Sequence, residues 1–169
     1  MKSICVFGIF VADLCFFSHT IPIRGQTVLG SKYLVGPGGK GSNQSIAAAR
    51  LGGEVKFITK LGVDNHAEMA LSLYKNLGMN ISTIIQDSKL TTGVAGIMID
   101  KKTGENIINV VPGAAGHLKN DDIDKNLDLI KESKIFLTQL ETPSEVTSYA
   151  LNKAKELGNK IILNPAPAA

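Results

Sequence analysis

The sequence has no large excess of one charge and no long hydrophobic run. Its 18 basic and 15 acidic residues give a net charge of only +3. The basic residues are scattered along the chain, as is typical of a solvated surface. No apolar stretch reaches the length of a membrane span. We therefore expect neither a nucleic-acid partner nor a membrane partner.

Cysteine and histidine are also scarce. The two cysteines, Cys5 and Cys15, lie in apolar, strand-like segments, and we expect them to stay reduced, as in a cytoplasmic protein. The three histidines, His19, His66 and His117, are far apart in the sequence. This dispersal predicts no metal-ligand cluster.

The apolar N-terminal stretch "MKSICVFGIFVADLCFF" allows two interpretations, a signal peptide or a buried strand. Asp13 interrupts the stretch, and no small-residue cleavage site follows it cleanly. A continuous apolar run over residues 4–10 is typical of a strand that is buried on both faces. We favour the buried strand.

The rest of the chain alternates between strand-like and helical segments. Further strands are expected at 55–62, at 135–141 and from 160 onwards, and helices at 42–51, between Asp64 and Gly78, at 121–131 and at 143–157. Such alternation predicts one α/β domain with a mostly parallel sheet covered by helices on both faces. Two β-rich segments, about 14–35 and 93–111, fit no strand–helix unit, and we place them as a flap over one edge.

Polar side chains are expected at one rim of the sheet. Asp13 follows the first predicted strand, Glu141 ends a later one and Asn164 follows the last. Ligands of open α/β sheets bind beyond the carboxyl ends of the strands. The three groups should therefore lie near a glycine-rich loop, "GPGGKGSN" at residues 36–43.

The glycine-rich loop has several possible interpretations. It formally matches G-x-G-x-x-G, the dinucleotide fingerprint, but Pro37 lies inside it and no acidic residue ends the following strand. A phosphate-binding P-loop is excluded because Lys40 is followed by Gly41 rather than by Ser or Thr. A simple turn into a helix needs one or two glycines, whereas this loop has four. Lys40 and Asn43 after such glycines favour close approach by a polar ligand, and an amide suits a sugar hydroxyl.

Several motifs, in the same order along the whole chain, resemble those of the ribokinase-type (PfkB) carbohydrate kinases. They are "GGKGSNQSIAAARLG", "PIRGQTVLG", "FITKLGVD", "TTGVAGIMID" with "GENIINVVPGAAG", "QLETP" and "LNPAPA". The resemblance implies a three-layer α/β fold with a small β-sheet lid made by segments 14–35 and 93–111. It also implies transfer of the γ-phosphate of MgATP to a sugar hydroxyl, with a monovalent cation as a further cofactor.

The resemblance also assigns roles to individual residues. Asp13 should accept hydrogen bonds from sugar hydroxyls, Glu141 should face those hydroxyls, and Asn164 should lie near the phosphate and the metal. The remaining sugar contacts implied are Gly39, Lys40 and Asn43 from the glycine loop, and Ala95 and Ile108 from the underside of the lid.

Two positions depart from the family pattern. Val11 stands where the resemblance implies a sugar-binding asparagine, and Gln26 replaces the usual glutamate. Valine cannot bind a hydroxyl, and an unmade hydrogen bond of this kind costs roughly 1–3 kcal/mol. Ribose is the leading substrate, and a deoxypentose would leave no hydroxyl unpaired at Val11.

The sequence holds no G-A-G-D segment, whose aspartate would deprotonate the acceptor hydroxyl; "PGAAG" at 112–116 is not that motif. We expect residues 1–169 to be the N-terminal, sugar-binding part of a kinase domain whose C-terminal part is missing, inactive alone and with an apolar sheet edge after the last strand. The lid is expected to join two chains in a homodimer. The alternatives are a non-catalytic sugar-binding or interaction protein derived from the family, and an unrelated dinucleotide-binding module.

Overall fold

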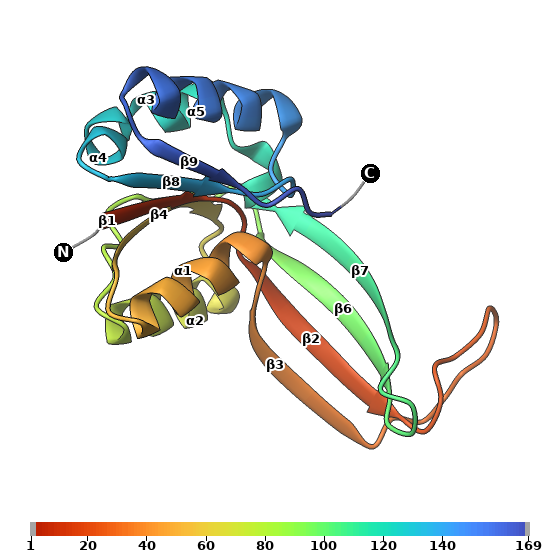
Figure 1. The fold of residues 1–169 in the computed structure, drawn as a ribbon. Helices are drawn as coiled ribbons and strands as arrows, with labels where there is room; N and C mark the ends of the chain where they lie inside the picture. Colours follow the sequence, from red (N-terminus) through yellow and green to blue (C-terminus); the bar gives the residue numbers. More distant parts are fainter. Residues whose placement is uncertain (1–2, 168–169) are drawn as a thin grey trace.

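A parallel sheet, sheet A, forms the centre of the larger part of the molecule (Figure 1). The computed structural model describes residues 3–167. Every neighbouring pair of strands in sheet A is parallel. Its strands, in spatial order, are β5 (Ile84–Gln86), β4 (Glu54–Leu61), β1 (Ser3–Phe7), β8 (Ile135–Thr138) and β9 (Lys160–Leu163).

Helices cover both faces of sheet A, which confirms the predicted three-layer α/β class (Figure 1). One face carries α1 (Lys40–Arg50) and α2 (Asn65–Asn76). The opposite face carries α3 (Asn120–Asp124), α4 (Leu127–Lys131) and α5 (Ser144–Glu156). The hydrophobic core is correspondingly divided into two clusters, one on each side of the sheet.

The apolar strands explain why sheet A is the centre of the fold. In β4, "EVKFITKL", only the first residue is exposed. Phe57 from this strand meets Tyr74 of α2 edge to face, with ring centroids 5.6 Å apart, on one side of the sheet. Phe7 of β1 stacks on Phe136 of β8 at 6.5 Å on the other side. Each fully buried side chain of this size contributes about 1.5–3 kcal/mol of hydrophobic stabilisation.

β4 also contains two buried lysines, Lys56 and Lys60. Each requires a partner because an unpaired charge is costly in a core. The Lys60 Nζ donates to Asp122 Oδ2 at 2.6 Å and to the carbonyl oxygen of His117 at 3.0 Å. Lys60 and Asp122 are both buried. This pair fixes α3 and the preceding 3₁₀ turn, η1 (Ala114–His117), to the end of β4.

A second sheet, sheet B, extends away from the helices and sheet A (Figure 1). It is mixed, because β2 pairs parallel with β6 while the outer pairs are antiparallel. β6 and β7, which include the predicted β-rich segment 93–111, pair antiparallel as a hairpin. The spatial order is β3 (Lys32–Gly38), β2 (Val11–Ser18), β6 (Thr92–Asp100) and β7 (Asn106–Gly113).

The predicted first strand was too long. β1 ends at Phe7, and the chain crosses into sheet B at Gly8, where an added Cβ would lie only 2.8 Å from the Cα of Gly41. Asp13 therefore lies inside β2 of sheet B rather than after a strand of sheet A. The third predicted strand likewise ends earlier, at Thr138, so Glu141 lies beyond it.

The predicted single helix over 121–131 was also wrong. It is divided into α3 and α4, with Asn126 between them in a non-helical conformation (φ −115°, ψ 11°). The Asn126 side-chain amide donates to the carbonyl oxygen of Asp122 at 2.8 Å, which satisfies a helix-end carbonyl locally. Within residues 3–167, no helix has the length and apolar character that crossing a bilayer demands.

Candidate functional site

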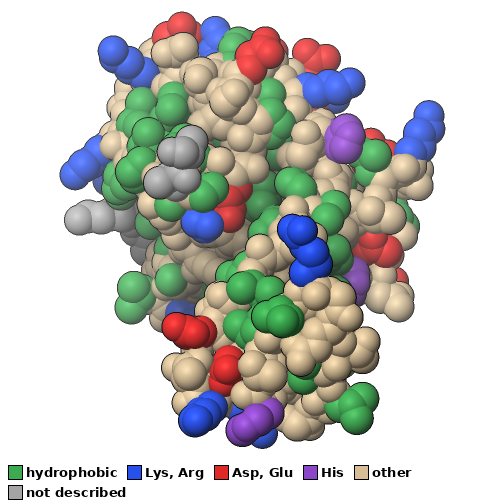
Figure 2. Space-filling view, turned by 90° about the vertical axis from the view of Figure 1, so that its right-hand side faces the viewer, with side chains coloured by type: hydrophobic (Ala, Val, Ile, Leu, Met, Phe, Trp, Pro, Cys, Tyr) green, Lys and Arg blue, Asp and Glu red, His purple; other side chains and the backbone are tan. Residues whose placement is uncertain are grey.

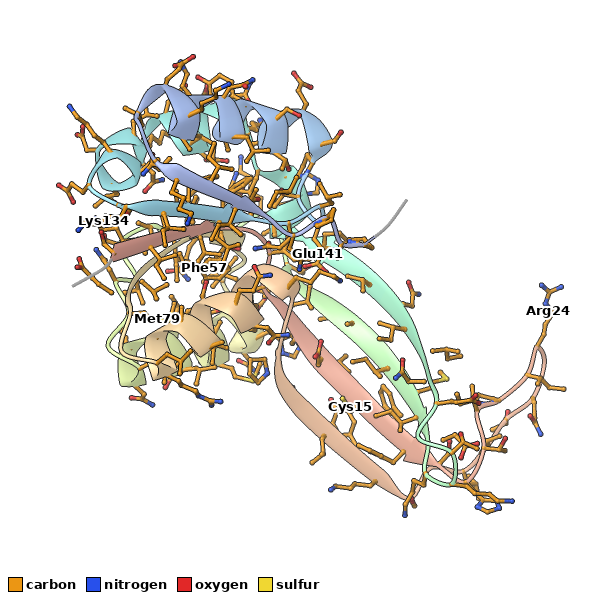
Figure 3. The ribbon with its side chains drawn as sticks, viewed as in Figure 1. Cys15, Arg24, Phe57, Met79, Lys134 and Glu141 are labelled. Carbon is orange, nitrogen blue, oxygen red and sulfur yellow. The ribbon has the colours of Figure 1, made fainter. Side chains whose placement is uncertain are left out.

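A cavity of about 180 Å³ lies where sheet B meets the first turn of α1 and the segment after β8. Figure 3 shows the labelled Glu141 at this junction, between the helical layers and the base of sheet B. Eight of the residues that the sequence singled out line the cavity, and Ile97 and Val110 join them. The complete lining is Val11, Asp13, Gly39, Lys40, Asn43, Ala95, Ile97, Ile108, Val110 and Glu141.

Gly39 allows the chain to turn sharply from β3 into α1 at the edge of this cavity. Its φ of 88° lies in the left-handed region, and a Cβ there would lie 2.5 Å from the carbonyl oxygen of Ile9. Only glycine fits such a position without strain. The same carbonyl accepts a hydrogen bond from the Ser42 amide at 3.1 Å, so the first turn of α1 is held against the crossing between β1 and β2.

Two hydrogen bonds join Lys40 to Glu141 on the polar side of the cavity. The backbone N–H of Lys40 donates to Glu141 Oε2 at 2.7 Å, and Nζ donates to Oε1 at 2.9 Å. Glu141 is mostly buried, with 12% of its side chain exposed, whereas the Lys40 side chain is 38% exposed. A carboxylate at the start of α1 is also favoured by the helix dipole. The pair brings together two parts of the chain that are 101 residues apart.

Asp13 supplies the second carboxylate of the cavity. It lies opposite Ala95 in β6 and Gly36 in β3, and its carboxylate occupies the space where a Cβ on Gly38 would otherwise lie. Burial raises the pKa of the Asp13 carboxyl, and the negative charge of Glu141 raises it further. Among residues 3–167, no side chain or backbone N–H donates a hydrogen bond to this carboxylate. Its oxygens are therefore available to a ligand that carries hydroxyl donors.

The opposite wall of the cavity is apolar. Ala95 pairs with Val110 across β6 and β7, and Ile97 pairs with Ile108, so all four lie on one face of sheet B. Val11 adds a further apolar side chain near the start of β2. A small cavity with carboxylates and amides on one side and aliphatic groups on the other suits a compact, hydroxylated molecule.

Ile97 and Val110 were missed by the sequence analysis, although a signal for them existed. Each lies two residues from a predicted contact, Ala95 or Ile108, and alternate residues of a strand share a face. Asn164, by contrast, does not line the cavity. It follows β9, and its backbone N–H donates to the carbonyl oxygen of Thr138 at 2.9 Å.

A larger open hollow, of about 460 Å³, lies between η1 and the start of α5. It contains none of the predicted site residues, and its lining includes two acidic side chains, Asp121 and Glu145, beside Lys119.

Figure 2 shows acidic and basic side chains scattered over one face of the molecule, with hydrophobic ones among them. Within the described part of the chain, no three His, Cys, Asp or Glu side chains gather as a metal site.

Comparison with known proteins places the chain in one family. The model of the pfkB family carbohydrate kinases matches residues 1–169. The chain is 32% identical to a deoxyribokinase from Salmonella typhi, covering 98% of this chain and 54% of the relative. It is 36% identical to a ribokinase from Haemophilus influenzae, covering 99% and 54%.

Solved structures agree with this assignment. A ribokinase from Thermotoga maritima superposes with a TM-score of 0.88 at 36% identity, covering 99% of this chain and 54% of that one. A ribokinase from Arabidopsis thaliana, complexed with ribose and ATP, gives 0.86 at 26% identity, covering 98% and 54%. The chain thus spans about half the length of these relatives. It belongs to the pfkB family of carbohydrate kinases.

Proposed function

We propose that the protein carrying this chain is an ATP-dependent kinase that phosphorylates a hydroxyl of a pentose, ribose or 2-deoxyribose. The observation that carries this proposal is the free carboxylate of Asp13 beside the Lys40–Glu141 pair in a small cavity. Relatives named ribokinase and deoxyribokinase support the same substrate class. The complex of the Arabidopsis ribokinase with ribose and ATP supports the choice of phosphate donor.

The polar side of the cavity would hold the sugar. Sugar hydroxyls can donate to Asp13 and to Glu141, while the Asn43 amide can both donate and accept. Lys40 keeps the Glu141 carboxylate in place through two hydrogen bonds, which preorganises the acceptor before the sugar arrives. Gly39 allows the tight turn that brings the backbone N–H of Lys40 to the edge of the cavity.

Sheet B would act as a lid over the bound sugar. Ala95 and Ile108 lie on the cavity face of this sheet and would exclude water from the sugar. Exclusion of water protects a phosphoryl donor from hydrolysis and strengthens the polar contacts inside the site. On this proposal, residues 1–169 form the N-terminal part of the kinase domain, with lid segments at about 14–35 and 93–111.

MgATP, with a monovalent cation, would supply the phosphoryl group and its charge neutralisation. Asn164 is the residue of this chain that we place nearest to the phosphate and the metal. No residue described here is assigned as the general base, and the sequence holds no G-A-G-D segment. We therefore propose that these 169 residues bind the sugar and have no appreciable turnover alone.

Val11 is proposed to set the preference between pentoses. Its side chain is buried in the cavity wall and offers no hydrogen bond. A hydroxyl placed against it would be stranded without a partner, at a cost of roughly 1–3 kcal/mol. A 2-deoxypentose would avoid that cost.

The decisive experiment is calorimetric titration of the protein with D-ribose and with 2-deoxy-D-ribose. Val11→Asn should improve the affinity for ribose relative to that for deoxyribose by about tenfold, since it restores roughly one hydrogen bond. Val35→Asn is the matched control, because Val35 lies in β3 outside the cavity. An unchanged ratio in Val11→Asn would contradict this account of the specificity. Failure of the unmodified protein to bind either sugar would reject the proposed function.

Two further features of the proposal concern partners and location. Apolar side chains exposed on sheet B support a homodimer joined through the lids. The free thiols of Cys5 and Cys15 support a reducing, cytoplasmic location. A non-catalytic sugar-binding protein is the second candidate, because residues of this chain line the cavity by themselves. Sugar binding without phosphoryl transfer in the protein carrying the chain would favour it.

A further inference from the structure

A buried amide, Gln139, lies behind the candidate site and has no role in the contacts described above. It follows β8 directly and is 1% exposed. Its Nε2 donates to Gln44 Oε1 on α1. Its Oε1 is buried and accepts no hydrogen bond from residues 3–167. A buried amide that is only half satisfied carries a cost, so its presence in a core requires an explanation.

Gln139 and Glu141 hold the same helix at two successive turns. The two residues are separated by one position after β8, and both reach α1. Their partners, Lys40 and Gln44, are four residues apart and therefore share one face of the helix. The first contact forms the polar side of the cavity, and the second lies one turn further along α1, away from the cavity.

The crossing between the two sheets packs against the same amide. At Gly8, an added Cβ would overlap Gln139 Oε1 and would lie 2.8 Å from the Cα of Gly41. At Gly41, an added Cβ would lie 3.1 Å from Gln139 Oε1. The Gln139 side chain thus fills the space where the β1–β2 crossing, the start of α1 and the end of β8 meet.

We propose that Gln139 is a positioning residue for the Lys40–Glu141 pair. Through Gln44 it fixes the distance between α1 and the segment after β8, so that Glu141 meets the Lys40 amide at the edge of the cavity. The sugar-binding consequence rests on the proposed function, whereas the effect on the start of α1 does not. The two can therefore be tested separately.

Amide hydrogen exchange, measured by NMR without ligand, tests the effect on α1. Gln139→Leu and Gln44→Leu should each speed exchange at Lys40, Ser42 and Asn43 by about tenfold relative to amides of α2, because roughly one hydrogen bond is lost. If Gln139→Leu does not fold, Gln44→Leu decides alone, since Gln44 is only half-buried. Amide exchange in the double variant should be no faster than in either single variant, since both substitutions remove the same contact.

Asn126→Leu is the matched control. It removes another buried amide, whose Nδ2 donates to the carbonyl oxygen of Asp122 between α3 and α4. It should lower overall stability without changing the exchange of the first turn of α1 relative to α2. The proposal is overturned if the glutamine variants change exchange no more selectively than this control does.

Titration with D-ribose and 2-deoxy-D-ribose separates the two proposals. If the unmodified protein binds either sugar, both glutamine variants should weaken that Kd by about tenfold while Asn126→Leu leaves it unchanged. An unchanged Kd in the glutamine variants would overturn the positioning role. If the unmodified protein binds neither sugar, the proposed function fails, and the exchange data still decide the role of Gln139.

Discussion

Sheet A and sheet B are built from similar apolar residues but are buried very differently. In β4 of sheet A, "EVKFITKL", seven of the eight residues are buried. In β7 of sheet B, "NIINVVPG", the first six are exposed. The difference comes from the layers, because helices pack on both faces of sheet A, whereas among residues 3–167 the helices contact sheet B only at its base (Figure 1).

The comparison separates residues that stabilise the fold from residues that are available for binding. The core clusters gather around sheet A and extend only to the base of sheet B. Exposed apolar patches on a soluble domain commonly mark ligand or partner surfaces. Sheet B offers one apolar face to the cavity and another to the surroundings, so substitutions there should affect binding more than folding.

The largest expected effect is in the core of sheet A. Phe57→Ala should lower the free energy of unfolding by about 3–5 kcal/mol, since it removes a fully buried ring that packs against Tyr74. Phe16→Ala in sheet B, where the residue is 43% exposed, should cost about 1 kcal/mol or less. Urea unfolding of the two variants provides the measurement. Equal losses would show that sheet B is as important to the fold as sheet A.

The layered fold was predictable from sequence because it depends on periodicity within each segment. Buried strands such as β4 are continuous apolar runs, and glycines such as Gly78 end the helices. What was missed depends on contacts between segments. The place where β1 ends is set by packing of Gly8 against Gly41, and the break between α3 and α4 by an amide contact of Asn126.

The candidate site was only partly predictable from the sequence. Asp13, Lys40 and Glu141 were found through motif resemblance, and the structure brings them around one cavity. Strand alternation could have added Ile97 and Val110, whereas their pairing with Ile108 and Ala95 across β6 and β7 is seen only in the structure. Gln139 also belongs to a recognised motif, but only the structure shows that its amide reaches α1.

An intermediate effect is expected at Asp13, where binding and stability should change in opposite directions. Asp13→Asn removes a partly buried charge beside Glu141, so it should raise the unfolding temperature by about 1–3 °C. The same change should abolish measurable pentose binding, because the carboxylate acceptor is lost. Thermal unfolding and calorimetric titration provide the two measurements. A variant that binds pentose normally would remove Asp13 from the site.

The pH dependence of stability tests whether the charge of Asp13 causes this gain. The pKa of Asp13 is raised in the folded chain, so the unfolded chain loses its proton first as the pH increases. Stability therefore falls between the ordinary pKa of about 3.9 and the raised value, and changes no further above it. The stability gain of Asp13→Asn should be present at neutral pH and disappear in acid below that window. A gain that is equally large in acid would show that charge is not its cause.

The smallest effect on folding, and the sharpest separation of folding from binding, is expected on the outer face of sheet B. Tyr33, Phe16, Met98 and Ile107 lie side by side across the four strands, and all are exposed. If this row joins two chains, Ile107→Lys should convert a dimer into a monomer in sedimentation velocity. The free energy of urea unfolding of the variant monomer should differ from that of the parent monomer by about 0.5 kcal/mol or less, since the residue is 51% exposed. Leu51→Lys, on an exposed residue after α1, is the control and should remain dimeric. A parent chain that stays monomeric at the highest concentration measured would mean that the apolar row does not join chains, and its exposure would then need another explanation.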